Sequence, residues 1–266
     1  MKSSEITLSN GLRPMIIDTV TGTPLLLLHG AESGAGQYDD LIQALPASIR
    51  SISFDQRDTA DTGDGSGGAG QPYDLGDIAD DAAAVLDALS LARAHVLGTS
   101  FGGAVAQHLA LRHPERVRSL ILVATTASSA PVRAYLARSD SMTADERRQW
   151  TLDGAVSPAG QRDAALVERV RAGLVERAPD QRARRLGALA THDTTAEVGR
   201  IAAPTLVIHG DDDPVMPLSS GEFLATTIPG ADLAIIEGGR HALAFEYRSR
   251  VAELVRTFVE KHDDGS

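Results

Sequence analysis

The chain has 266 residues, 42% of them hydrophobic, and a formal net charge of −11 at pH 7. This length suits one hydrophobic core with an inserted lobe better than two independent domains, and the acidic balance without a basic run argues against a nucleic-acid-binding protein. The chain has no cysteine, which excludes disulfides, thiolate nucleophiles and zinc–thiolate sites.

The N-terminal residues do not follow the pattern of a secretion signal and are predicted to form a hairpin. Residues 1–15 lack the apolar core of about 7–15 residues that follows the basic start of a signal peptide. No apolar run in the chain approaches the ~20 residues of a membrane helix. We therefore expect a cytoplasmic protein without a membrane partner. The runs Glu5–Leu8 and Arg13–Ile17 flank a short turn and predict an antiparallel hairpin at a sheet edge.

Short apolar runs recur along the rest of the chain and are typical of strands buried on both faces. A sixth run, Ile49–Phe54, alternates in polarity and predicts a strand nearer the sheet edge. Between Leu75 and Leu89 the apolar residues follow helical spacing. This alternation of strands and helices predicts an α/β fold with a mostly parallel sheet covered by helices on both faces. The five uniformly apolar runs are Pro24–Leu28, Ala94–Leu97, Ser119–Val123, Thr205–Ile208 and Leu233–Ile236.

The strand pattern stops between about residues 126 and 200, where Arg- and Ala-rich helical stretches take over. We therefore predict a core of residues 1–125 and 201–266 with a helical cap inserted at 126–200. Within the insertion, Tyr135, Met142 and Trp150 are candidates for lining an apolar pocket, although such residues serve equally well as ordinary packing. Its many arginines are expected to form a solvated helix face.

Two glycine-rich motifs suggest different functions. The stretch Gly63–Gly68 matches G-x-G-x-x-G, but it neither follows a strand directly nor opens a helix, so we predict a surface loop rather than a dinucleotide site. The only lysines, Lys2 and Lys261, lie near the termini, which leaves no plausible P-loop or Schiff-base lysine. No metal or organic cofactor is expected.

The second motif, Gly98–Gly102, matches G-x-S-x-G and has Ser100 at its centre. It follows the predicted strand Ala94–Leu97 and precedes small residues that predict a helix from Gly103, which is the setting of a nucleophile elbow. Such a turn strains the serine backbone and requires small residues on either side. It also directs the N–H of Phe101 to where an oxyanion would form.

A serine hydroxyl needs a base, and the base needs a group that orients it. His241 follows the run Leu233–Ile236 and two glycines, and Asp211, Asp212 and Asp213 follow the run Thr205–Ile208. Serine, aspartate and histidine thus occur in the chain order of one known type of serine hydrolase. From the residues alone, the choice among the three aspartates stays open.

Six segments together resemble the successive signatures of cap-bearing α/β-hydrolases, and they extend over nearly the whole chain. The resemblance implies the α/β-hydrolase fold and a Ser100–Asp213–His241 triad, because Asp213 matches the acid in G-x-x-D-x-x-x-P. It also implies an oxyanion hole formed by the backbone N–H groups of Ala31 and Phe101. The segments are LLLLHGAESG, SFDQRDT, HVLGTSFGG, RVRSLILVATT, PTLVIHGDDDPVMP and GGRHALAFE. Within them, Asp55–Thr59 resembles the D-x-R-D-T of polyketide methyl esterases such as the anthracycline methylesterases.

We expect this chemistry to be hydrolysis of a carboxylic ester of a small or medium-sized organic substrate through an acyl-enzyme. Three alternatives keep the same triad: a perhydrolase or cofactor-free haloperoxidase-like activity, a C–C bond hydrolase and a lactonase. A ligand-binding protein or non-hydrolytic cyclase could also reuse the fold. The excess of arginine over lysine indicates a bacterial source, and the oligomeric state stays open.

Overall fold

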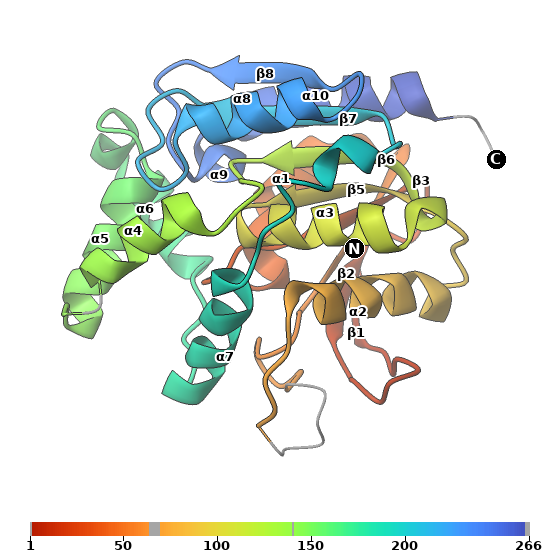
Figure 1. The fold of residues 1–266 in the computed structure, drawn as a ribbon, viewed down its shortest axis with the longest axis horizontal. Coiled ribbons are helices and arrows are strands. Elements are labelled where there is room, and N and C mark those ends of the chain that lie inside the picture. Colours follow the sequence, from red (N-terminus) through yellow and green to blue (C-terminus); the bar gives the residue numbers. More distant parts are fainter. Residues whose placement is uncertain (1, 64–69, 140, 264–266) are drawn as a thin grey trace.

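Eight strands form one sheet in the order β1-β2-β4-β3-β5-β6-β7-β8, in a computed structural model that describes residues 2–63, 70–139 and 141–263 (Figure 1). The pairs β1–β2 and β2–β4 are antiparallel and all other neighbours are parallel. The predicted α/β class with a mostly parallel sheet is therefore confirmed. The strands are β1 (Lys2–Glu5), β2 (Met15–Asp18), β3 (Thr23–Leu28), β4 (Ile49–Phe54), β5 (Ala94–Thr99), β6 (Val117–Val123), β7 (Thr205–Gly210) and β8 (Asp232–Ile236).

The five apolar runs correspond to β3 and β5–β8, each longer than predicted by one or two residues. The N-terminal hairpin is confirmed at the sheet edge, although its strands β1 and β2 are displaced from the predicted ranges. β4 has the predicted bounds, but it lies inside the sheet between β2 and β3. Its alternation reflects buried serines rather than solvent exposure, since Ser51 and Ser53 are both buried and Ser53 donates to the Ala35 carbonyl.

Helices cover both faces of the sheet. Residues of α2, α3 and α8 belong to one apolar cluster with one sheet face, and residues of α1, α9 and α10 belong to a second cluster with the other. α2 occupies the predicted range and begins at a capping box in which Asp74 and Asp77 exchange side-chain and backbone hydrogen bonds. The helices of the core are α1 (Asp39–Ala44), α2 (Leu75–Ala88), α3 (Phe101–Arg112), α8 (Leu218–Thr227), α9 (Leu243–Glu246) and α10 (Arg248–His262).

Between β6 and β7 the described residues form four further α-helices, drawn in green and teal at the left of Figure 1. Apolar residues of α5 and α6 form a small cluster of their own, against which Ala242 and Phe245 of the core pack. Isolated bridges join Ser33 to Leu174 and Ser128 to Asp193, so the inserted segment is bonded to the core and to itself. The four helices are α4 (Ala130–Ser139), α5 (Ala144–Ala155), α6 (Ala164–Ala172) and α7 (Pro179–Ala190).

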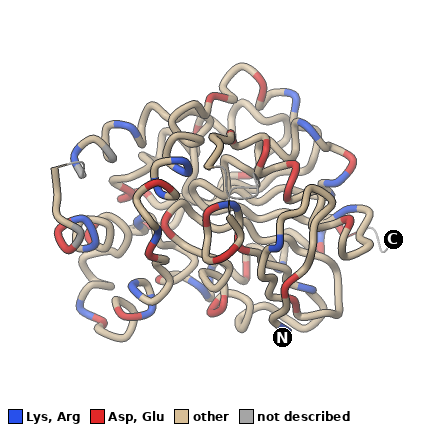
Figure 2. Tube along the Cα trace, turned by 90° about the horizontal axis from the view of Figure 1, so that it is seen from below, with Lys and Arg blue, Asp and Glu red and all other residues tan. Residues whose placement is uncertain are grey.

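Acidic and basic residues are interspersed along the chain, as Figure 2 shows for the described part. None of the helices in that part combines the length and the apolar composition that crossing a lipid bilayer requires. The glycine-rich stretch Gly63–Gly68, predicted as a surface loop, lies outside the described residues from position 64 onward.

Candidate active site

Ser100 occupies the turn between β5 and α3 in a backbone conformation that L-residues rarely adopt. Its φ and ψ are 55° and −117°, which is a strained region for a residue with a side chain. Three hydrogen bonds fix the turn: Ser100 N–H donates to the Val123 carbonyl, and the Ser100 carbonyl accepts from Thr125 Oγ1 and from the N–H of Ala104. The surrounding structure thus holds the serine side chain beyond the end of β5.

The glycines around Ser100 are required by close packing of strand and helix. A Cβ on Gly98 would overlap the carbonyl group of Gly102, and a Cβ on Gly102 would overlap the carbonyl group of Leu28 at the end of β3. Helix α3 begins at Phe101, two residues earlier than predicted. The glycines therefore allow this helix to start directly after the serine.

Gly102→Ala is expected to destabilise the fold by about 3 kcal/mol or more, because the new methyl group has no space beside the Leu28 backbone. Thermal unfolding followed by circular dichroism measures the effect. Gly187→Ala in α7 is the matched control, since a Cβ there meets nothing within 4 Å and Ala favours a helix by about 0.5–1 kcal/mol. Equal melting temperatures for Gly102→Ala and the unchanged protein would refute this account of the turn.

Side chains from the carboxyl ends of three strands meet in one hydrogen-bonded series. His241 Nε2 lies 2.9 Å from Ser100 Oγ, and His241 Nδ1 lies 2.8 Å from Asp213 Oδ2. Ser100 follows β5, Asp213 follows β7 and His241 follows β8. His241 lies 141 positions after Ser100 and 28 positions after Asp213. The parallel sheet brings the three residues together because the carboxyl ends of its strands lie at one edge.

Each of the three consecutive aspartates has a different partner. Asp213 Oδ1 accepts the N–H groups of Val215 and Met216 at 2.8 and 2.9 Å, which leaves Oδ2 for His241. Asp211 accepts the N–H of Gly238 at 2.6 Å. Asp212 forms an ion pair with Arg240 at 2.8 Å. Only Asp213 contacts the imidazole, while its two neighbours hold the loop that carries His241.

The loop after β3 presents its backbone to the same site. The N–H of Gly30 donates to Gln37 Oε1 at 2.8 Å. Burial, followed by the charges of Arg185 and Arg177, lowers the pKa of His29 well below its usual value, which favours the neutral imidazole. His29 accordingly donates from Nδ1 to the Gly30 carbonyl and accepts the N–H of Gln56 at Nε2. These bonds hold Ala31 at the pocket wall.

Phe101 is fully buried, and as the first residue of α3 it has a backbone N–H with no carbonyl one helical turn before it. The helix dipole adds partial positive charge at this end. Ala31 lines the pocket that Ser100 and His241 also line. The oxyanion-hole role of the Ala31 and Phe101 N–H groups stays a prediction.

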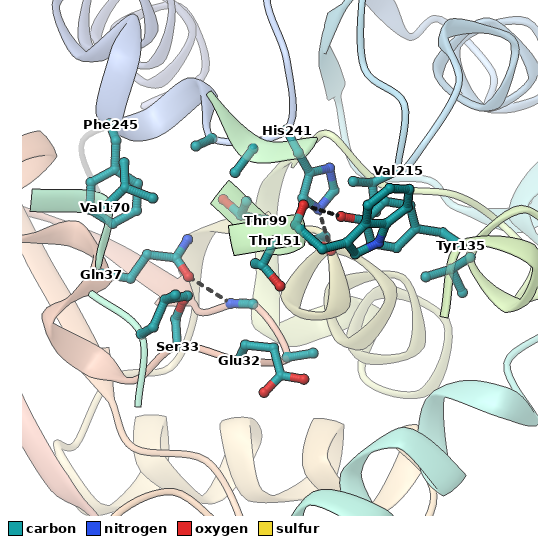
Figure 3. A pocket seen from close by; sticks show the side chains of 18 of the residues that line it. Glu32, Ser33, Gln37, Thr99, Tyr135, Thr151, Val170, Val215, His241 and Phe245 are labelled. Carbon is teal, nitrogen blue, oxygen red and sulfur yellow. Dashed lines mark hydrogen bonds between the residues drawn. The ribbon is translucent and has the colours of Figure 1, made fainter. Parts of the chain in front are cut away.

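A mostly apolar pocket opens above Ser100 and His241. It contains about 1010 Å³ of empty space, including the part open to solvent. Figure 3 shows His241, Val215 and Tyr135 on one side, with Gln37, Val170 and Phe245 on the other. The charged residues in the lining are Glu32, Arg147 and Arg182, and Arg182 pairs with Glu32 at 3.0 Å.

Two of the three cap residues predicted from sequence line this pocket. Tyr135 stacks on Trp150 with ring centroids 5.3 Å apart, and its hydroxyl donates to the Trp150 carbonyl. Burial raises the pKa of Tyr135, and the negative charge of Asp213 adds to this effect. Met142 instead lies between α4 and α5 and is not one of the lining residues. Its contact with the substrate stays a prediction.

The arginines of α7 and the segment before it are not a solvated face, contrary to the prediction. Arg185 is 1% exposed. Arg184 forms an ion pair with Asp58 through two hydrogen bonds of 2.8 and 2.7 Å, and Arg177 donates to the Asp58 carbonyl and to Thr59. The D-x-R-D-T motif thus binds the inserted segment, a role that sequence reasoning missed because it requires knowing that positions about 120 residues apart meet.

Within residues 2–63, 70–139 and 141–263, no three His, Asp or Glu side chains lie together as metal ligands would.

Comparison with known proteins decides the family. Residues 23–248 match the family model described as serine aminopeptidase, S33. The chain is an α/β-hydrolase. This α/β-hydrolase is 29% identical to a 2-hydroxymuconate semialdehyde hydrolase of Pseudomonas sp. (strain CF600), over 95% of this chain and 92% of the relative. It is also 30% identical to a pimeloyl-[acyl-carrier protein] methyl ester esterase of Neisseria meningitidis (serogroup B, strain H44/76), over 88% and 92% of the two chains.

A solved structure of a hydrolase from Pseudomonas aeruginosa PA01 superimposes on this α/β-hydrolase with a TM-score of 0.85 at 29% identity, covering 97% of this chain and 98% of the other. The relatives include esterases and other hydrolases. This α/β-hydrolase therefore belongs to the serine hydrolase and esterase family, and it is an enzyme that hydrolyses its substrate.

Proposed function

We propose that this α/β-hydrolase cleaves a carboxylic ester of a small or medium-sized organic molecule through an acyl-enzyme. Ser100 is the nucleophile, His241 the general base and Asp213 the residue that orients the base. The observation that carries the proposal is the hydrogen-bonded series from Asp213 through His241 to Ser100, which ends in a mostly apolar pocket.

In the first half of the reaction, His241 Nε2 accepts the hydroxyl proton while Ser100 Oγ bonds to the ester carbonyl carbon. Asp213 keeps the Nδ1 proton of His241 in place and stabilises the imidazolium. The tetrahedral oxyanion accepts hydrogen bonds from the backbone N–H groups of Ala31 and Phe101. Collapse breaks the bond to the alkoxide, which takes the proton from His241 and leaves as the alcohol.

In the second half, His241 accepts a proton from water, and the resulting hydroxide bonds to the acyl carbon. Collapse of this second oxyanion breaks the bond to Ser100 Oγ, and the serine recovers its proton from His241. One water molecule is consumed, and one carboxylic acid and one alcohol are formed. The residues named here suffice for every step, so the proposal includes no metal or organic cofactor.

The pocket supports an uncharged, largely apolar substrate. Of its three charged lining residues, Glu32 and Arg182 neutralise one another. We propose that residues 126–200 act as a cap over the core of residues 1–125 and 201–266, and that Tyr135 and Trp150 contact the substrate. Both aromatic residues line the pocket beside Ser100 and His241. We propose that the substrate is a dissolved small molecule and that the enzyme acts in the cytoplasm of a bacterium.

A second candidate is hydrolysis of a C–C bond in a diketone-like acid. The 29% identity with a 2-hydroxymuconate semialdehyde hydrolase over most of both chains favours it. The same three residues serve this reaction, and Arg147 in the pocket lining supplies a cation for an acidic substrate. Lactone hydrolysis and peracid formation use the same acyl-enzyme and are further outcomes of the test.

Steady-state assays of the purified enzyme on a substrate panel test this function. The panel contains methyl and p-nitrophenyl esters of short and medium acids, a γ-lactone, a 2-hydroxy-6-oxo-dienoate, and acetate with hydrogen peroxide. We expect the highest kcat/KM for an apolar medium-chain ester, because apolar burial contributes about 0.8 kcal/mol per methylene group. Enzyme blocked at Ser100 with a fluorophosphonate is the control. A kcat/KM for the dienoate above that of every ester would replace the proposal by the second candidate.

A further inference from the structure

Arg185 is a buried cation whose hydrogen bonds, within the described residues, go to uncharged groups. It extends from α7 into the core and donates to the carbonyls of Gly30, Ala31 and Arg57 and to Gln56 Oε1, at 2.8–3.3 Å. Burial, followed by the charge of Arg177, lowers the pKa of Arg185. The neighbouring Arg184 differs, because it forms its ion pair with the Asp58 carboxylate.

Two of these carbonyls flank the N–H of Ala31. The carbonyl of Gly30 and the N–H of Ala31 belong to one peptide group, and this bond is trans. In a trans peptide the carbonyl and the N–H point in opposite directions. Arg185 and His29 hold the Gly30 carbonyl from the protein interior, so the N–H of Ala31 is turned away from them, toward the pocket that Ala31 lines.

Arg185 also contacts the residue that supplies the second donor. Its guanidinium carbon lies 4.3 Å from the centroid of the Phe101 ring, which is a cation–π contact. Ala31 and Phe101 follow different strands, β3 and β5, and Arg185 of α7 lies 84 residues beyond Phe101 (185 minus 101). Arg185 is thus a single side chain that touches both loops.

We propose that Arg185 is a positioning residue of the oxyanion hole, which it aligns and polarises from behind. This inference rests on the proposed function of Ser100 and its two backbone donors. The guanidinium fixes the Gly30–Ala31 peptide plane and the Phe101 ring, and its charge strengthens the Ala31 N–H as a donor, because hydrogen bonds in series polarise one another. The hydrolase core thereby depends on the inserted helix α7 for transition-state stabilisation as well as for covering the pocket.

A purely structural role would require only that Arg185 attach α7 to the core. Arg184 already performs that task through an ion pair with the buried Asp58. Burying a guanidinium opposite backbone carbonyls is costly, because the desolvation is not offset by a carboxylate. The guanidinium of Arg185 lies beside both proposed backbone donors, and its effect on them would account for this desolvation cost.

Arg185→Lys is the test variant and Arg184→Lys is its matched control on the same helix. Both are measured below their melting temperatures, and rates are normalised to sites that a fluorophosphonate labels to completion. For Arg185→Lys we expect kcat to fall by about tenfold or more with KM within about threefold, since removal of a direct oxyanion donor costs about 10²–10³ in kcat. The affinity for a boronic acid, which forms a tetrahedral adduct with serine, should fall in parallel, while the affinity for the product acid stays constant.

Arg184→Lys should lower the melting temperature and leave the ratio of boronic-acid to product-acid affinity unchanged. Gln56→Glu is a second, nearly isosteric variant, in which a carboxylate meets the Arg185 guanidinium and neutralises its charge. It should lower kcat by about tenfold and still fold, because the new carboxylate gives the buried guanidinium an ion-pair partner in exchange for the hydrogen bond that Gln56 Nε2 donates to the His29 carbonyl. This variant decides the question if Arg185→Lys does not fold.

Equal affinity ratios for Arg185→Lys, Arg184→Lys and the unchanged enzyme would overturn the inference, as would an unchanged kcat for a folded Gln56→Glu. The proposed function fails through a different observation, namely that the unchanged enzyme is not labelled at Ser100 by the fluorophosphonate. The two failures are therefore distinguishable.

Discussion

Ser100→Ala is expected to lower kcat by about 10⁴–10⁶-fold on the best ester, because the acyl-enzyme cannot form without the hydroxyl. The residual rate arises from the pocket and the backbone donors, which remain in place. Stopped assays with several hours of incubation, or product detection by mass spectrometry, measure the remaining activity. Labelling by a fluorophosphonate should disappear completely in the same variant.

The fold should survive this substitution. The Ser100 hydroxyl is hydrogen-bonded to His241, whereas the turn is held by the Ser100 backbone through Val123 and Thr125. Alanine keeps a Cβ and meets the same strain at a φ of 55°. We therefore expect melting temperatures within about 2 °C, which corresponds to less than about 1 kcal/mol for a protein of this size. A folded Ser100→Ala enzyme with more than a tenth of the original kcat would remove Ser100 as the nucleophile.

Asp213→Asn is expected to lower kcat by about 10³–10⁴-fold through the wrong tautomer of His241. The N–H groups of Val215 and Met216 both donate to Oδ1, so the asparagine must place its carbonyl oxygen there. Its NH₂ group then faces His241 Nδ1, which has to accept instead of donate. The imidazole proton moves to Nε2, where it blocks acceptance of the Ser100 proton.

The kcat of Asp213→Asn is measured with the ester used for Ser100→Ala. Asp212→Asn is the control, since it removes a partly exposed ion pair with Arg240 beside the same loop, and such pairs are worth about 0–1 kcal/mol. We expect it to retain kcat within about threefold. If the Asp212 variant loses as much activity as the Asp213 variant, a displaced loop, rather than the tautomer of His241, accounts for the effect.

Local patterns were sufficient to predict most of the fold. Uninterrupted apolar runs such as Thr205–Ile208 are typical of buried strands, since a strand with helices on both sides has no polar face, and β7 lies there. The strand, glycine and serine order around Ser100 predicted a turn of strained geometry, and its φ of 55° is in that region. Each of these inferences concerns residues close together in the chain. Over such short distances, the spacing of residue types indicates which side of a strand or helix is buried.

The resemblance to a family favoured Asp213 over its two neighbours, and the contact with His241 follows from the geometry of the loop. Without that resemblance, the order of strand, acid and histidine along the chain does not distinguish the three consecutive aspartates. They become different only when Gly238 and Arg240 return from β8 to bond with Asp211 and Asp212. That return is a tertiary contact across 27–28 residues, and sequence spacing does not specify it.

By itself, the sequence predicted most of the strands, the helix at 75–88, the turn at Ser100 and the place of His241 after the last strand, because periodicity and glycine placement are local properties. Only the tertiary structure decided that Arg185 enters the core, that the D-x-R-D-T motif binds the inserted helix, and that Met142 is not one of the residues lining the pocket. The sequence pattern of an amphipathic helix is the same whether its arginine faces water or buried backbone carbonyls. Which of the two it meets depends on how a distant segment packs, and that packing is a property of the whole chain.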